Sequence, residues 1–201
     1  MAANAVDVIN SVTVSGSYTS TVTFDLSSVT VSDYRFFKMS AVCKSTSGVY
    51  GSRGNGYDHI LQYFNGNGST GNYAWGGLLT DASATGGTFI TYNTTHANST
   101  RLGRIPNKGK TYNAQTDAWG LVESYIQVTD TDWETTGMAH VMSVGGTKSD
   151  GFNSGYYDGA ITRGSFWWNN TAVLTSITYD LVSAYFLAGS KFNLYGFKNT
   201  A

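Results

Sequence analysis

Residues 20–26 read Ser-Thr-Val-Thr-Phe-Asp-Leu, so that apolar and polar side chains alternate along the stretch. In an extended chain Val22, Phe24 and Leu26 would point to one side, and the polar residues between them to the other. This period of two is typical of a strand with one buried and one solvated face. The same kind of pattern recurs along the chain, and it predicts an all-β fold.

Other stretches predict further strands, and their spacing is typical of a β-sandwich or jelly roll. In residues 191–198, Phe192 and Leu194 would lie on one face and Tyr195 and Phe197 on the other. We expect a single domain of about eight to ten antiparallel strands. The stretches with the clearest patterns are residues 20–26, 34–44, 58–64, 73–80, 121–129, 138–144, 156–168, 172–181 and 191–198.

Three parts of the chain have weaker patterns. The turn residues at 65–72, rich in Gly and Asn, predict that residues 58–80 form a β-hairpin. Residues 81–118 are polar and could form a long excursion at one end of the sandwich or part of an interface, with short strands at 89–92 and 100–105. Residues 1–20 could form an N-terminal arm.

The composition agrees with this fold class and limits the function. Aromatic residues make up 14% of the 201 residues, and charged residues only 12%, about half of the roughly 25% usual for a globular domain. The net charge of -1, without a Lys/Arg cluster, excludes the basic surface that nucleic-acid binding requires. Cys43 is the only cysteine, so no intrachain disulfide can form, and we expect it to be a buried apolar side chain.

The first residues show no sign of a secretory signal. They lack a basic region followed by an apolar core, and no run in the chain approaches the roughly 20 apolar residues of a transmembrane helix. We therefore expect a soluble protein that is made in a cytoplasm and has no membrane partner.

Residues that could carry out chemistry are few. His59, His96 and His140 are not spaced as metal ligands, and no motif for a catalytic nucleophile, a phosphate or a dinucleotide is present. For His59 and His140 we expect packing or surface positions within strands. We expect neither a cofactor nor an enzymatic activity.

One acidic run is a weak candidate for a metal site. Asp130, Asp132 and Glu134 alternate in the sequence and could supply oxygen ligands to Ca²⁺ from one side of a strand. They could equally be the polar end of a strand that runs into a turn. A glycosidase pair is disfavoured, because the acid and the nucleophile of such enzymes stand at a defined separation that one local run does not provide.

The aromatic residues are more numerous than one core needs. The 5 Trp, 14 Tyr and 10 Phe could fill the space between two sheets, stack on sugar rings or anchor a protein interface. Trp167 and Trp168 are adjacent, so that in a strand one ring would lie in the core and the other outside it. The candidate interface or glycan-binding residues are Trp75, Trp119, Trp133, Trp167 and Trp168.

Several segments resemble the structural proteins of tailed-bacteriophage virions, of the head-decoration or tail-fibre-like kind. Residues 171–179 and 186–197 carry the resemblance, and the second of these contains the ending Gly-Ser-x-Phe-x-Leu-Tyr-Gly. Residues 61–75 and 121–128 are also similar to that family. The family has Asp where this chain has Asn67, and residues 1–55 show no match.

The resemblance implies a β-sandwich of the virion without enzymatic activity. The first hypothesis is a capsid decoration or cement protein, a homotrimer that contacts itself and the major capsid protein. The alternative is a tail, fibre or baseplate module that binds a host receptor or glycan. A depolymerase is disfavoured, because the sequence shows no constellation of carboxylates or histidines. The protein would be made in the host cytoplasm and located in the virion.

Overall fold

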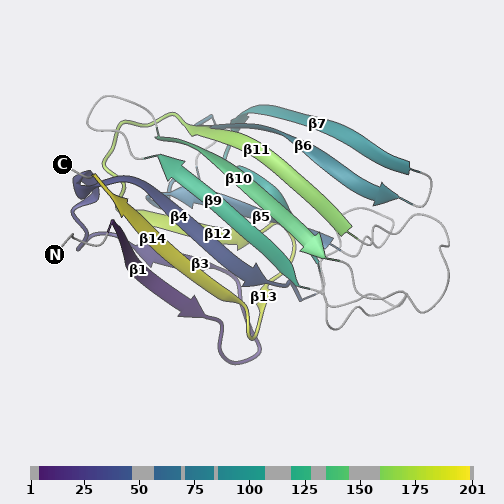
Figure 1. The fold of residues 1–201 in the computed structure, drawn as a ribbon, viewed down its shortest axis with the longest axis horizontal. Helices are drawn as coiled ribbons and strands as arrows, with labels where there is room; N and C mark the ends of the chain where they lie inside the picture. The colour runs from purple at the N-terminus through teal and green to yellow at the C-terminus, as the bar shows by residue number, and fades with distance from the viewer. Residues whose placement is uncertain are drawn as a thin grey trace.

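The structure is a computed structural model, and it describes residues 5–46, 57–68, 71–83, 86–106, 119–127, 135–144 and 159–199. These residues contain strands and one 3₁₀ turn, η1 (Val31–Asp33), but no α-helix. The expected all-β class is therefore confirmed. The strands form two sheets that pack face to face as one β-sandwich, with the larger sheet in front in Figure 1.

The sheets are antiparallel throughout. The order of the eight strands in the larger sheet is β1 (Val6–Thr13), β14 (Lys191–Lys198), β4 (Tyr34–Cys43), β9 (Gly120–Gln127), β10 (Thr135–Val144), β11 (Gly159–Trp168), β6 (Tyr73–Ser83) and β7 (Gly86–Ala97). The order of the four strands in the smaller sheet is β3 (Val22–Asp25), β12 (Ser176–Leu181), β5 (Tyr57–Phe64) and β8 (Thr100–Pro106). A further pair joins β13 (Phe186–Leu187) to β2 (Tyr18–Thr19).

The described residues contain fourteen strands, more than the expected eight to ten. The sequence patterns missed β1 and the two short strands β2 and β13. β1 is an edge strand whose side chains are all exposed or half-buried, so no alternation marks it, and a bulge lies between Val8 and Asn10. Residues 6–13 are thus part of the sheet. Within the expected excursion, residues 86–106 include β7 and β8, and residues 107–118 lie outside the described residues.

The predicted hairpin at residues 58–80 is wrong. β5 pairs with β12 and β8 in the smaller sheet, whereas β6 pairs with β11 and β7 in the larger one. Asn65 and Gly66, with φ of 53° and 64°, have left-handed conformations directly after β5. Such residues permit any sharp change of direction, and here the chain crosses from one sheet to the other.

The inner faces of the two sheets follow the predicted alternation. Val22 and Phe24 of β3 are buried while Thr23 and Asp25 are exposed, as the sequence predicted. β14 buries Phe192 and Leu194. The tandem tryptophans also divide as expected, since Trp168 is fully buried and Trp167 is half-buried on the opposite face.

Large aromatic rings from both sheets fill the space between them. Phe64 of the smaller sheet lies 5.2 Å from the ring of Trp168 and 6.0 Å from that of Phe166, both in the larger sheet. Further along the sandwich, the Tyr179 ring lies 6.2 Å from that of Phe192. A substantial part of the aromatic content is therefore core, and this agrees with one of the readings that the sequence left open.

A buried polar contact also joins the two sheets. The Ser124 hydroxyl of β9 donates a hydrogen bond of 2.8 Å to Oε1 of Gln62 on β5, and both residues are fully buried. A buried polar group is stable only with a partner, so this bond favours one register of the two sheets.

Gly103 lets β8 approach the larger sheet closely. A Cβ atom at this position would lie 2.7 Å from Cβ of Val141 and 2.9 Å from Cβ of Thr162. Both of these atoms are fixed to the backbone of the larger sheet, so they cannot rotate away. The short distance between β8 and strands β10 and β11 therefore depends on glycine.

Replacing Gly103 should separate the sheets locally. We expect Gly103→Ala to lower the free energy of unfolding by about 1–3 kcal/mol, as overpacked core positions do, measured by urea denaturation. Gly68→Ala is the matched control, because a Cβ there meets only the carbonyl oxygen of Asn98 at 4.0 Å. Equal stability of the two variants would contradict this account of Gly103.

Candidate interaction surface

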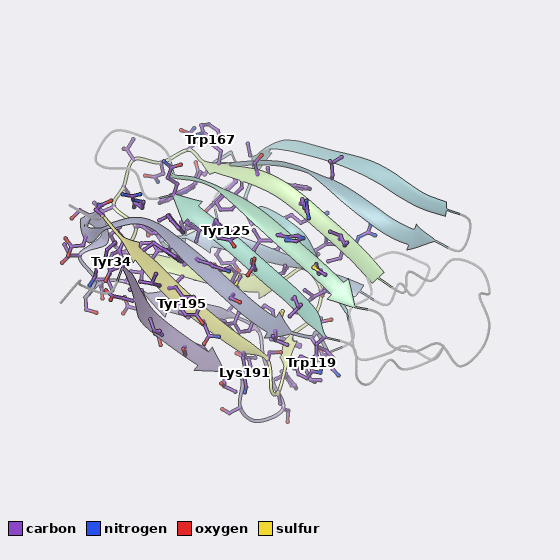
Figure 2. All side chains as sticks on the ribbon, in the orientation of Figure 1. Tyr34, Trp119, Tyr125, Trp167, Lys191 and Tyr195 are labelled. Atoms are coloured by element: carbon purple, nitrogen blue, oxygen red, sulfur yellow. The ribbon has the colours of Figure 1, made fainter. Side chains whose placement is uncertain are left out.

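The outer face of the larger sheet is open to solvent in the described part of the chain. The smaller sheet covers only the inner face, and Figure 1 shows no strand in front of β4, β9 and β10. Figure 2 shows Tyr125 and Tyr195 over the middle of this sheet, and Trp119 and Lys191 near one end of it. Because side chains alternate along a strand, every second residue of each strand contributes to this outer face.

Four apolar side chains form a row across the outer face, which we call the apolar row. They are neighbours in register on four adjacent strands, and three of them are more than two-fifths exposed. A contiguous exposed apolar patch is uncommon on a monomer and usually marks a contact site. The row consists of Val42 on β4, Leu121 on β9, Met142 on β10 and Ile161 on β11.

Two ion pairs lie on and beside the outer face. Lys38 forms a salt bridge with Glu123 on the next strand and lowers the pKa of that carboxyl group. At the edge of the sheet, the Tyr34 hydroxyl donates a hydrogen bond of 2.8 Å to Asp7, and Lys198 forms a salt bridge of 3.0 Å with it. The Tyr34 bond and then Lys198 lower the pKa of Asp7. Within each pair the two charges compensate one another.

Aromatic rings on the outer face pack against one another. Phe36 and Phe197 are neighbours in register, with ring centroids 4.3 Å apart and planes at 14°. Tyr125 lies 6.4 Å from Phe36, and the Lys38 ammonium lies 5.2 Å from the Tyr125 ring centroid. The stacking of Phe36 on Phe197 covers one face of each of these two rings.

The four tryptophans in the described part of the chain do not form one site. Trp168 and Trp75 are on the inner face, where Trp168 is core and Trp75 packs at its margin with the Arg101 guanidinium 5.4 Å from its ring. Trp167 lies on the outer face, and Trp119 lies just before β9, with the Lys44 ammonium 4.9 Å from its ring. Trp133 lies outside the described residues.

The most exposed aromatic pair was missed by the sequence analysis. Tyr18 and Tyr185 are 57% and 46% exposed, and their ring centroids are 4.8 Å apart. Tyr18 is in the short strand β2, and Tyr185 immediately precedes its partner β13. They are 167 positions apart in the sequence, and both short strands lack a detectable pattern, so only the fold brings the rings together.

The ending Gly-Ser-x-Phe-x-Leu-Tyr-Gly has a structural explanation at each small residue. Gly189 has a φ of 87° at the turn before β14, a conformation that favours glycine. Ser190 is buried, and its hydroxyl accepts a hydrogen bond of 3.3 Å from the Lys44 amide. A Cβ on Gly196 would lie 2.5 Å from the Tyr34 ring. The motif therefore specifies the fold of β14.

The Asn-Gly-Asn turn after β5 also has a structural role. Oδ1 of Asn65 accepts hydrogen bonds of 2.7 and 3.1 Å from the amides of Thr175 and Ser176, which ties the turn to the start of β12. Oδ1 of Asn67 accepts a hydrogen bond of 2.9 Å from the Asn72 side chain. An aspartate carboxylate at this position could accept that bond as well.

The residues considered for metal binding or reactivity form no such site in the described part of the chain. There, no group of three His, Cys, Asp or Glu side chains could hold a metal ion. Asp130, Asp132 and Glu134 lie outside the described residues. Cys43 is fully buried, as expected, and burial raises the pKa of its thiol.

The histidines occupy strands. His59 is buried in β5, and His140 is half-buried in β10, in agreement with the expected packing or surface positions. His96 falls within β7, and its side chain lies outside the described residues. Burial, together with the positive charges of Arg101 and Arg104, lowers the pKa of His59 from 6.5 to about 3. His59 is therefore neutral at ordinary pH.

The lowered pKa of His59 predicts that acid destabilises the protein. Between pH 6.5 and pH 3 the unfolded state binds a proton that the folded state does not, so the free energy of unfolding should fall as the pH falls through this range. A single proton gives a slope of at most about 1.4 kcal/mol per pH unit. Urea unfolding of the wild type and of His59→Gln at several pH values measures the slope of the free energy of unfolding against pH. The slope should be smaller in the variant, and identical slopes would exclude His59 as its source.

Comparison with known proteins gives no family for this chain. No protein-family model and no curated protein matches the sequence. Among solved structures, the chain is similar to one described as "NanB plus Optactamide", with 12% identity, a TM-score of 0.35, and coverage of 97% of this chain and 27% of that one. It is also similar to the receptor-binding domain of botulinum neurotoxin type G, with 14% identity, a TM-score of 0.20, and coverage of 83% and 36%.

A third similar structure is the carbohydrate recognition domain of Emp47p, with 11% identity, a TM-score of 0.22, and coverage of 94% of this chain and 96% of that one. This chain spans only 27% and 36% of the length of the first two structures. With such low TM-scores, none of these similarities supports a conclusion about function. A separate finding is that the described residues include no helix that is both long and apolar enough to cross a membrane.

Proposed function

We propose that the protein is a structural component of a tailed-bacteriophage virion, and that it decorates the capsid by surface contact rather than by catalysis. The observation that carries this proposal is the open outer face of the larger sheet, with its apolar row of Val42, Leu121, Met142 and Ile161. The resemblance of the C-terminal segments to virion proteins supports the phage setting.

The outer face is large enough for a stable interface. Eight strands spaced about 4.8 Å apart span roughly 34 Å, and four rows of outward side chains span roughly 20 Å along the strands. The product, about 700 Å², is close to the roughly 800 Å² that each partner buries in a standard protein interface. The outer face alone could therefore form a stable interface.

The partners that we propose are further copies of the chain and the major capsid protein. The apolar row and the low charge content of the chain favour repeated contacts with little repulsion between copies. A homotrimer is the expected assembly, because the three-fold positions of a capsid accept a three-fold symmetric partner. The protein would then be located in the virion.

A charge placed in the apolar row should weaken capsid binding. In co-sedimentation with expanded capsids of the source phage that lack this protein, we expect the wild type to bind and to raise the capsid melting temperature. Leu121→Lys, which should fold because Leu121 is 44% exposed, would bury an unpaired charge and weaken binding at least about tenfold.

The matched control for this experiment is Val173→Lys, because Val173 is 70% exposed on the segment before β12, outside the outer face. It should bind as the wild type does. Absence of binding by the wild type would reject the decoration role. Equal binding by the two lysine variants would show that the apolar row is not the contact surface.

The exposed pair of Tyr18 and Tyr185 favours a second candidate function, a tail, fibre or baseplate module that binds a host receptor or glycan. Exposed tyrosines offer both apolar rings and hydroxyl groups to a ligand. The pair lies on the short β2–β13 sheet and does not belong to the outer face.

Binding of the isolated protein to host cells and to glycan arrays tests this second candidate. If the tyrosine pair is the binding site, Tyr185→Ala should weaken attachment at least about tenfold, since a single aromatic anchor can contribute this much. Val173→Ala, at another exposed apolar position, should leave attachment unchanged. Failure of the wild type to attach would reject the receptor function and leave the capsid proposal intact.

A further inference from the structure

Strand β7 (Gly86–Ala97) is the last strand at one end of the larger sheet, and among the described strands it pairs only with β6. With twelve residues it is the longest strand in the described part of the chain. Figure 1 shows no strand beyond it. Every second residue of an edge strand directs its backbone N–H and C=O groups away from the sheet. β7 therefore offers a row of hydrogen-bonding groups to another chain.

The backbone of β7 is regular over nine residues. Residues 86–94 pair one to one with β6, from Gly86 opposite Ser83 to Thr94 opposite Trp75. The register shifts only beyond this stretch, where Ala97 pairs with Tyr73. A second strand could therefore extend the sheet along the whole of residues 86–94 without a break in the ladder.

The other three edges of the two main sheets have features that hinder such pairing. β1 has a bulge between Val8 and Asn10, β3 has only four residues, and β8 contains two arginines and ends at Pro106. Bulges, short strands, charges and proline are the usual means by which proteins protect an exposed edge. Residues 86–94 contain no Asp, Glu, Lys, Arg or Pro, and their register is regular. Of these four edges, only that of β7 lacks protection.

The sequence of β7 is compatible with pairing to a second copy of itself. In a homotypic strand pair, a charged residue near the centre meets its own copy, and like charges across a pair are destabilising. Residues 82–100 contain no Asp, Glu, Lys or Arg, so two copies of this segment meet without such repulsion. The central residues 88–92 are Thr, Phe, Ile, Thr and Tyr, all of which favour strands.

We propose that β7 pairs antiparallel with β7 of a second copy, so that the larger sheets of the two copies join into one continuous sheet. A two-fold axis perpendicular to the sheet relates the copies. Full overlap of residues 86–94 places this axis at Ile90. The two outer faces then lie on the same side of the joined sheet. The contact uses an edge and not the outer face, so its failure would leave the proposed function unaffected.

The size of this contact predicts a weak association that depends on concentration. Nine paired residues form about nine hydrogen bonds, close to the roughly ten of a standard interface. The buried area is smaller, because a strip about 30 Å long and about 10 Å wide gives about 300 Å² for each copy. This is less than half of the roughly 800 Å² usual for a stable interface. We therefore expect the edges to be unpaired in dilute solution and paired at high concentration.

Single cysteines along β7 test the pairing in the full chain. A residue on the two-fold axis lies opposite its own copy, with Cα atoms about 4.5–5.5 Å apart, a distance that a disulfide can span. Under mild oxidation, Ile90→Cys should form a covalent dimer at least about tenfold faster than Thr171→Cys, measured by non-reducing electrophoresis. Thr171 is the control because it is exposed and lies outside the strands, and the native Cys43 is fully buried. Cysteines at each position from 86 to 94 locate the axis.

Complementary charges give a second test that needs no oxidation. Thr91 pairs in register with Leu78, which is 49% exposed, so the fold should tolerate a charge at this position. In a pair centred on Ile90, the two copies of Thr91 are diagonal neighbours. Thr91→Lys and Thr91→Asp should each weaken association at least about threefold in sedimentation equilibrium, and an equimolar mixture of the two should restore it. Thr171→Lys should associate as the wild type does.

Two results would overturn the proposal. The first is a cysteine series in which no position from 86 to 94 crosslinks faster than Thr171→Cys, even at the highest soluble concentration. The second is equal association of the wild type, Thr91→Lys, Thr91→Asp and their mixture. Misfolding cannot imitate the expected result, because two misfolded variants would not recover association when they are mixed.

Discussion

The packing of aromatic rings between the two sheets is the constraint on which the remainder of the structure depends. Phe64 contacts both Phe166 and Trp168 across the interior, and rings of this size set the distance between the sheets. At Gly103, which has no side chain, β8 lies so close to the larger sheet that even a Cβ atom would not fit. Each strand therefore alternates apolar and polar residues, because one of its faces supplies rings to the core and its other face lies outside the sandwich.

The same constraint explains why the outer face remains rich in apolar and aromatic groups. The core is complete without Phe36, Phe197 and the apolar row, so folding alone does not require them. A face that only met water would be expected to carry more charge, yet charged residues make up only 12% of the chain. Coverage of this surface by a partner, as proposed, would account for both observations.

The sequence predicts most of this fold and little of its candidate sites. Strands such as β3 and β14 are predictable because their inner and outer positions differ in polarity. β1 lacks that contrast, and the turn at Asn65 has the same residues whether the chain forms a hairpin or changes sheets. The Tyr18–Tyr185 pair joins segments distant in sequence, so no local pattern marks it. The ending Gly-Ser-x-Phe-x-Leu-Tyr-Gly resembles that of a virion family, but its glycines are explained by backbone conformation and packing.

The bulge in β1 affects how copies of the protein can associate. An edge strand carries backbone groups that another chain can pair with, and repeated pairing of this kind leads to fibres. The irregular register between Val8 and Asn10 interrupts that row of groups, so an incoming straight strand cannot pair along its full length. Open-ended polymerisation through this edge is thereby disfavoured, so that copies of the protein would have to associate through another surface, such as the outer face of the larger sheet.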